Sequence, residues 1–318
     1  MTRTRSASDL RGILLALSGF TFWVLADTSI KIVGRSSLPA YQVLAFMGLV
    51  VSVAVVLYAA LRRPAAPGDR SLSLGSRKLS VLKPIAAHHQ AIRSMLDLTN
   101  NFCVVVALRH VSLPLFYILV FMAPLVVTLL VAIFFSELIG LRRIVAVIAG
   151  FAGVVIAVNP FSSSRQGDWI GFLACMVCVA CFSVNMVWSR VLIRTETPES
   201  LTLFTGVVMI VAGSVGMLIH AEPVPIRTLF ALLAMGLFCA AGSICFFVAL
   251  KHTSALNVSQ YHYTQLLTGS LLTWLIWRQL PTPSMILGGV LIVAAGLYIA
   301  LPRSRIPSPP TNAPSSQG

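Results

Sequence analysis

The stretch RSMLDLTNN, residues 93–101, places charged and amide side chains inside a long apolar region. Wound as a helix, it puts Arg93, Asp97, Asn100 and Asn101 on one face, because residues four, seven and eight positions apart lie in line. A carboxylate and two amides in an apolar setting predict contacts with a polar or cationic ligand. Burial also favours the neutral form of a carboxyl group, so Asp97 is a candidate for proton coupling.

Two structural alternatives apply to this stretch. Arg93 and Asp97 are one helical turn apart, so they could neutralise each other and serve only the helix. Arg93 also opens the predicted span, where a long side chain can reach the cytoplasmic surface. If Arg93 instead contacts a ligand, its guanidinium is suited to a carboxylate.

Other polar side chains also lie within apolar segments. Asp27 could bind a cation or carry a proton, or it could pair locally with Lys31. Tyr261 and Gln265 belong to a polar stripe that predicts either substrate contacts or hydrogen bonds between helices. His262 lies off this stripe and is either a proton-responsive group or a packing residue. The predicted substrate-binding set is Asp27, Arg93, Asp97, Asn100, Asn101, Tyr117, Tyr261 and Gln265, and the coupling candidates are Asp27, Asp97 and His262.

The composition identifies the elements that must hold these residues. The chain has 318 residues, 57% of them hydrophobic and only 10% charged, with a mean hydropathy of +0.90. A soluble protein of this length carries far more charge, so we expect an all-α polytopic membrane protein. The net charge of +14 is explained by positive residues in cytoplasmic loops rather than by a nucleic-acid partner.

Ten transmembrane helices are predicted from runs of about 20 apolar residues. They span 12–34, 39–61, 89–108, 112–136, 142–159, 168–191, 199–219, 227–250, 254–277 and 283–302. Residues 62–88 form a basic loop, and residues 1–11 and 303–318 are tails, the second with a disordered composition. Most of the 23 Lys and Arg residues fall on the side of the two tails, which predicts that both termini are cytoplasmic and fits a bacterial inner membrane.

The two halves of the chain resemble each other. FCVVVALRHVS, residues 102–112, aligns with ICFFVALKHTS, residues 244–254, and the first span aligns with the sixth, so that Lys31 meets Arg190. Each half, 12–159 and 168–302, therefore has five spans. Because five is odd, the second repeat must be inverted in the membrane, as in many secondary transporters.

The repeat also supplies an internal comparison for the opening stretch. RSMLDLTNN aligns with MGLFCAAGS, so Arg93 meets Met235 and Asp97 meets Cys239. The same element of the fold is thus built without charges, which favours a functional interpretation of Asp97, Asn100 and Asn101.

Segment 93–160 carries the motifs by which the chain resembles the drug/metabolite transporter superfamily, in its EamA branch. They are an Arg that opens the third span, Pro124 in the middle of the fourth, Glu137 at its end, a basic pair and a glycine-rich fifth span. Within the branch, the first half is most similar to bacterial S-adenosylmethionine uptake transporters. The resemblance implies a central cavity surrounded by spans one, three, four, six, eight and nine, with spans five and ten outside.

No cofactor or metal site is predicted. Cys175, Cys178 and Cys181 have the spacing of metal ligands, but they also mark one face of a helix, and no His or Asp completes a cluster. Hydrolase, phosphate-loop and dinucleotide motifs do not occur in the sequence.

The sequence therefore predicts a secondary transporter, not an enzyme. Its substrate is expected to be a small cationic or zwitterionic metabolite, and S-adenosylmethionine fits both the acidic and aromatic residues and the resemblance. The alternatives are an amino-acid or drug/metabolite exporter on the same scaffold and, more remotely, an integral-membrane transferase. The expected partners are the small-molecule substrate and the lipid bilayer, and the oligomeric state stays open.

Overall fold

The computed structural model describes residues 2–61, 81–134, 141–159, 168–253 and 255–300, and all regular structure in these ranges is helical. In the first half the helices are α1 (Thr2–Val33), α2 (Ala40–Leu61), α4 (Ala87–His110), α5 (Leu113–Val120), α6 (Met122–Phe134) and α7 (Leu141–Val158). In the second half they are α8 (Trp169–Leu192), α9 (Pro198–Ile219), α10 (Ile226–His252), α11 (Ala255–Gln260), the 3-10 turn η1 (Tyr261–Tyr263), α12 (Thr264–Trp277) and α13 (Pro283–Ala300).

Each predicted span corresponds to a helical segment, but two of them are interrupted. Span 112–136 divides into α5 and α6 at Phe121, and span 254–277 divides into α11 and α12 at η1. Pro124 gives a cause for the first break, because a proline clashes with the carbonyl four residues earlier, and Val120 is the last residue of α5.

In the described part of the chain, seven helical segments are long and apolar enough to cross a bilayer: α1 from Leu10 onward, α2, α4, the α5–α6 segment, α8, α9 and α10. Two shorter apolar stretches, Ile144–Val158 and Pro283–Gly296, lie in α7 and α13. The chain is therefore a multi-pass membrane protein. Helix α1 begins at Thr2, before the predicted start of the first span at residue 12, whereas most of loop 62–88, Glu137 and the tail 303–318 lie outside the described residues.

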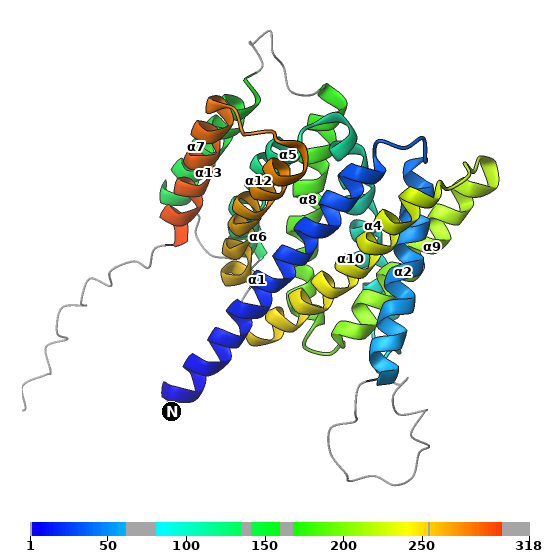
Figure 1. Cartoon of the computed structure of the whole chain (residues 1–318). Coiled ribbons are helices and arrows are strands. Elements are labelled where there is room, and N and C mark those ends of the chain that lie inside the picture. Colours follow the sequence, from blue (N-terminus) through cyan, green and yellow to red (C-terminus); the bar gives the residue numbers. More distant parts are fainter. Residues whose placement is uncertain (1, 62–80, 135–140, 160–167, 254, 301–318) are drawn as a thin grey trace, which may run out of the picture.

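The helices pack in pairs, each joining one half of the chain to the other (Figure 1). Helix α1 lies along α10, α4 along α8, α2 along α9, and α7 along α13. Close approach in the α2–α9 pair depends on glycine, since a Cβ on Gly48 would lie 2.5 Å from the Gly206 carbonyl oxygen. Small residues at such crossings let membrane helices come together.

Two basic side chains bind helix ends in equivalent ways. The Lys31 Nζ on α1 donates to the carbonyls of Leu108 and Val111, at 2.5 and 2.7 Å, at the C-terminal end of α4. The Arg190 guanidinium on α8 donates to the Leu250 carbonyl at the C-terminal end of α10. Because the last carbonyls of a helix have no partner within it, a cation there both satisfies them and complements the helix dipole.

Candidate functional site

An internal cavity of about 90 Å³ lies at the centre of the bundle. It is lined by side chains from α1, α2, α4, α5, α8, α9, α10, η1 and α12, and no lining residue that the structure describes comes from α7 or α13. The resemblance implied that α7 and α13 lie outside, and it did not include α2 and α9, which contribute Met47, Val51, Thr202, Thr205 and Met209. Asp27, Asp97, Asn100, Asn101 and Gln265 of the predicted substrate-binding set all line this cavity.

The Asp97 carboxylate connects three helices. Its Oδ1 accepts a hydrogen bond from the Asn185 Nδ2 of α8 at 2.9 Å, and its Oδ2 accepts one from the Thr205 hydroxyl of α9 at 3.0 Å. The Arg93 Nη1 lies 3.4 Å from the same Oδ2. With 22% of its side chain exposed, Asp97 both holds the helices together and presents its carboxylate to the cavity.

Arg93 is fully buried, so it does not extend to a membrane surface as one sequence-based alternative had it. Its Nη2 donates to the Leu201 carbonyl at 2.8 Å and to the Thr205 hydroxyl at 2.5 Å. The guanidinium also lies 5.3 Å from the centre of the Phe247 ring. Arg93 is not among the residues that line the cavity, and its contacts join α4 to α9 and orient Asp97.

Asn100 and Asn101 differ in which side-chain group is already hydrogen-bonded and which is left for a ligand. The Asn101 Nδ2 donates to the Asp97 backbone carbonyl at 2.8 Å, within α4. The Asn100 Oδ1 accepts from the Cys178 thiol at 3.0 Å, across the α4–α8 contact. Their remaining amide groups face the cavity together with the Asp97 carboxylate.

Asp27 lies on α1 and accepts a hydrogen bond from the Tyr117 hydroxyl of α5 at 3.0 Å. Within the described part of the chain Tyr117 is the only hydrogen-bond donor to this carboxylate, and Lys31 is bound to the end of α4 instead. The alternative interpretation of Asp27, a local pair with Lys31, is therefore not what the structure shows. Tyr117 is 1% exposed and packs against Gly269, so it positions Asp27 without lining the cavity itself.

The broken ninth span supplies Gln265 and His262. The Gln265 Nε2 donates to the Phe20 carbonyl at 3.2 Å. His262 is 3% exposed, stacks on Phe20 at 4.9 Å, lies 5.0 Å from Phe182, and its Nδ1 has no partner among the described residues. Tyr261 is not part of the cavity lining and packs instead against a separate apolar cluster.

Sequence reasoning missed Asn185 and Thr205, which bind both oxygens of Asp97. A signal for Asn185 was available, because Asn185 and Ser189 are polar residues one turn apart in an apolar span, and they are hydrogen-bonded at 3.0 Å. Thr205 gave no comparable signal, since threonine is ordinary in membrane helices and often bonds its own backbone.

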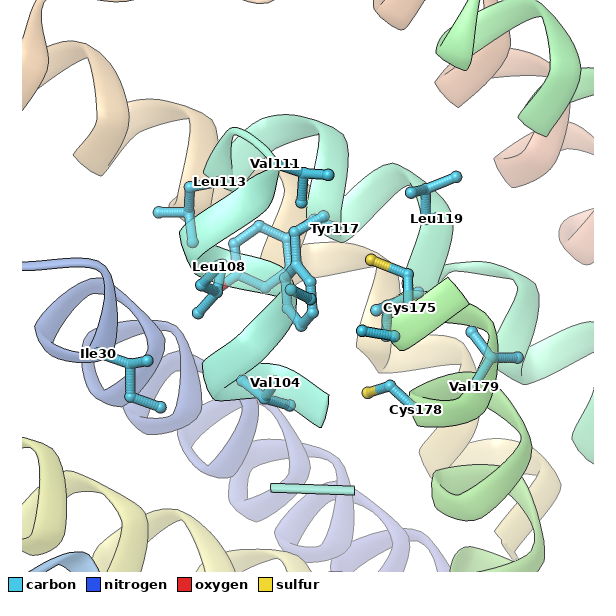
Figure 2. Close-up of a cluster of buried hydrophobic side chains, with 14 of the residues drawn as sticks. Ile30, Val104, Leu108, Val111, Leu113, Tyr117, Leu119, Cys175, Cys178 and Val179 are labelled. Carbon is cyan, nitrogen blue, oxygen red and sulfur yellow. The ribbon is translucent and has the colours of Figure 1, made fainter. Parts of the chain in front are cut away.

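Apolar side chains close the cavity beside Asp27. Figure 2 shows Ile30, Val104, Leu108, Leu113 and Tyr117 together, from α1, α4 and α5. Ile30 and Val104 line the cavity. The cavity is large enough for several water molecules, each of which needs about 10–15 Å³, but ligand pockets are commonly about 300–1,000 Å³. The cavity is therefore smaller than a typical ligand pocket.

The comparisons with known proteins agree with this architecture. Residues 169–301 match the model of the EamA-like transporter family. The pseudopaline exporter of Pseudomonas aeruginosa is 27% identical over 297 residues, which cover 92% of this chain and 96% of the exporter. The S-adenosylmethionine uptake transporter of Rickettsia bellii is 25% identical over 182 residues, 56% of this chain and 60% of that protein.

Two further similarities extend the comparison. The riboflavin transporter of Rhizobium johnstonii is 27% identical over 184 residues, 57% of this chain and 59% of that protein. A protein of known crystal structure is 18% identical in sequence to this chain, and the superposition covers 92% of this chain and 96% of that protein, with a TM-score of 0.63. The two proteins therefore share the same fold. The predicted resemblance is confirmed, because residues 169–301 match the EamA-like transporter family and the similar proteins named here are transporters.

Proposed function

We propose that this protein is a secondary transporter that moves a small cationic or zwitterionic metabolite across a membrane by alternating access. The observation that carries the proposal is the presence of two carboxylates, Asp27 and Asp97, at one internal cavity between helices of both halves. Carboxylates are costly within a membrane, so two of them facing one cavity favour a functional role. Trp23, Phe182 and Phe246 also line the cavity and are suited to cation–π contact with a positively charged ligand.

The two halves, 12–159 and 168–302, are proposed to be inverted repeats. The packing supports this. The alignment equates α1 with α8 and α4 with α10, so a repeat that contains the α1–α10 contact should also contain an α8–α4 contact, and both contacts are present. The Lys31 and Arg190 contacts correspond in the same way, and the interrupted spans occupy equivalent positions. Transporters of this kind bind substrate between the repeats at broken helices. We place both termini in the cytoplasm and the protein in a bacterial inner membrane.

The contacts divide the predicted residues into two groups. Asp27, Asp97, Asn100, Asn101 and Gln265 are proposed to touch the substrate, since they line the cavity. Arg93 and Tyr117 are proposed to position the two carboxylates, and Tyr261 is left out of the set. Asp27, Asp97 and His262 are the candidates for carrying a coupling proton.

S-adenosylmethionine is the proposed substrate to test first, because it carries a sulfonium, an ammonium and a carboxylate. Cells that express the chain should take up the labelled compound saturably, and excess unlabelled compound but not methionine should block the uptake. Asp27→Asn should abolish uptake, whereas Arg278→Gln, far from the cavity lining, should leave it unchanged. No uptake at any imposed gradient would exclude this substrate.

Export is the second candidate function. The observation that favours it is the exporter from Pseudomonas aeruginosa, which aligns over 92% of the chain, whereas the uptake transporter from Rickettsia bellii aligns over 56%. Inside-out membrane vesicles distinguish the two directions. An exporter accumulates labelled metabolite in such vesicles under an imposed proton gradient, and the Asp27→Asn variant should not.

A further inference from the structure

A second cavity, of about 670 Å³, has the C-terminal end of α1 in its lining. Figure 1 shows this end of α1 on the opposite side of the bundle from the N-terminus. The cavity is formed where α1 ends, α4 meets α5, α12 ends and α13 begins. Its lining includes Lys31, Arg35, Arg109 and His110, and no carboxylate is among its described lining residues. An excess of positive charge in a cavity of this size is complementary to an anion.

Several donors in this basic pocket are uncommitted. The Arg109 Nη2 donates to the Leu38 carbonyl at 2.5 Å, but its Nε is buried and has no partner among the described residues. The Ser112 hydroxyl is also buried and has no hydrogen-bond partner among the described residues. Lys31 uses two of its three donors on helix carbonyls. His110 differs, because its Nδ1 is already hydrogen-bonded to the Asp168 Oδ2 at 2.7 Å.

An apolar groove of about 610 Å³ continues from the basic pocket. It is lined by residues of α5, η1, α12 and α13, and Met285 belongs to the lining of both. Its walls are almost entirely apolar, and Leu267 and Val290 are 73% and 61% exposed at its rim. The Thr264 hydroxyl donates to the Tyr261 carbonyl at 2.7 Å, so this polar group is already satisfied.

Tryptophan side chains indicate where the boundary between membrane and water lies. The Arg35 guanidinium is 5.7 Å from the Trp277 ring, and the Arg278 guanidinium is 5.3 Å from the Trp274 ring. Tryptophan and long basic side chains collect at the headgroup level of a bilayer. The basic pocket is therefore at headgroup depth, and the groove along α12 and α13 lies at the depth of the acyl chains.

We propose that the basic pocket and the apolar groove together bind one anionic phospholipid. The headgroup phosphate lies among Lys31, Arg35 and Arg109, and an acyl chain occupies the groove between α12 and α13. The two spaces adjoin at Met285, which lines both, and this favours a lipid over a soluble anion, because a soluble anion would not occupy the apolar groove. The inference concerns a site other than the central cavity and does not depend on the transported substrate.

Native mass spectrometry of the purified full chain in detergent tests the proposal. Phosphatidylglycerol and phosphatidylcholine with the same acyl chains are offered in equal amounts, and the bound fraction of each is measured. The unaltered protein should retain the anionic lipid preferentially. Arg35→Gln should lower that preference about fivefold, and adding Arg109→Gln should lower it further, since each basic residue near an anionic headgroup contributes a similar factor.

Two more variants separate the lipid from a soluble anion. Gly289 lines the groove, so Gly289→Phe places a large side chain in it. The helix should tolerate the change, since a Cβ at Gly289 makes only ordinary contacts at 3.6 Å with Ile118 and Leu266. This variant should abolish phosphatidylglycerol retention although the basic residues remain. Arg278→Gln removes a basic side chain at the same depth but outside the pocket lining, and should change nothing. Each variant is first checked for an unaltered melting temperature and elution volume.

Some outcomes overturn the proposal. If Arg35→Gln and Gly289→Phe both retain phosphatidylglycerol as the unaltered protein does, there is no lipid site here. If glycerol 3-phosphate displaces the lipid and Gly289→Phe has no effect, the pocket binds a soluble phosphate instead. If phosphatidylcholine binds equally well, the basic residues do not recognise the headgroup charge.

Discussion

Helices α4 and α10 are aligned with each other in the proposed repeat, yet their cavity faces differ in chemistry. Each ends with carbonyls bound by a basic side chain, Lys31 for α4 and Arg190 for α10. Arg93 and its aligned residue Met235 are both fully buried, and Asp97 and its aligned residue Cys239 both line the cavity. The fold thus places these positions in the same environment and tolerates either charged or uncharged residues there.

The difference indicates what the charges add. On α10, Met235 is buried without charge, and the Cys239 thiol has a side-chain hydrogen bond with Ser243 of the same helix. On α4 the charged pair is instead held by Thr205 and Asn185 of neighbouring helices. A buried arginine is stable only while its partners are present. The charges of α4 therefore make the position of α4 depend on α8 and α9, which couples the site to the packing of both halves.

Replacing Asp97 by the α10 residue, Asp97→Cys, should have the largest effect. The substitution leaves the Arg93 guanidinium buried without its carboxylate partner. Removing one partner of a buried ion pair lowers the free energy of unfolding by about 3–5 kcal/mol. A large fall in the melting temperature in detergent is expected. The matched control is the double variant Arg93→Met/Asp97→Cys, which reproduces the α10 face and should recover most of the stability but not transport. A single variant as stable as the unaltered protein would contradict the importance of the pair.

Lys31→Met and Arg190→Met test the feature that α4 and α10 share. Each variant removes the donor to buried helix carbonyls, and an unsatisfied buried polar group costs about 1–3 kcal/mol. Similar falls in melting temperature are expected for both, because the contacts are equivalent. Arg194→Met, one turn from Arg190 and exposed, is the control. A loss in only one of the two variants would show that the halves differ in their packing as well.

Asn185→Ala isolates one of the bonds that only the charged face has. A hydrogen bond to a charged group contributes about 1.5–3 kcal/mol to the free energy of unfolding. Because Asp97 is partly exposed, we expect the Asn185–Asp97 bond to contribute an amount near the lower end of this range. Stability should fall less than in Asp97→Cys, while the substrate concentration needed for half-maximal transport should rise. Ser189→Ala, which removes the donor to Asn185 and not to Asp97, should have a smaller effect on transport.

The smallest effect is expected at the N-terminus of α8. The hydrogen bond from the Gly171 backbone N–H lowers the pKa of the Asp168 carboxyl group below its usual value of 3.8, and the hydrogen bond with His110 lowers it further by a smaller amount. A lowered pKa means that the charged form stabilises the fold near neutral pH and that this contribution is lost as the pH falls through the lowered pKa. As the pH is lowered from about 6 to a value below the lowered pKa of Asp168, the melting temperature of Asp168→Asn should therefore fall less than that of the unaltered protein. Equal changes would contradict the capping role.

Much of the helical framework and part of the site could be predicted from the sequence. The apolar runs located the helices, and the alignment of the two halves identified Asp97, Asn100 and Asn101 as unusual by comparison with Cys239, Gly242 and Ser243. Lys31 was left out of the predicted substrate-binding set, since Arg190 is its aligned residue. The structure adds its partner, which is the end of α4 rather than Asp27.

The remaining features depended on contacts between segments far apart in the chain. Asn185 and Thr205 bind Asp97 across 88 and 108 residues, so no local pattern could assign them. The exclusion of Tyr261 from the cavity follows from the 3-10 turn that interrupts the ninth span, and a regular helix would have rotated it differently.

The sequence by itself determined that the chain crosses a membrane, where its helices run and which of their residues are chemically out of place, because these properties depend on hydrophobicity and periodicity along the chain. The tertiary structure alone decided that Arg93 is buried against α9, that Tyr117 holds Asp27 and that both carboxylates share one cavity. Those facts depend on how helices rotate and cross. That arrangement is set by side-chain packing between distant segments, for which spacing along a single helix carries no information.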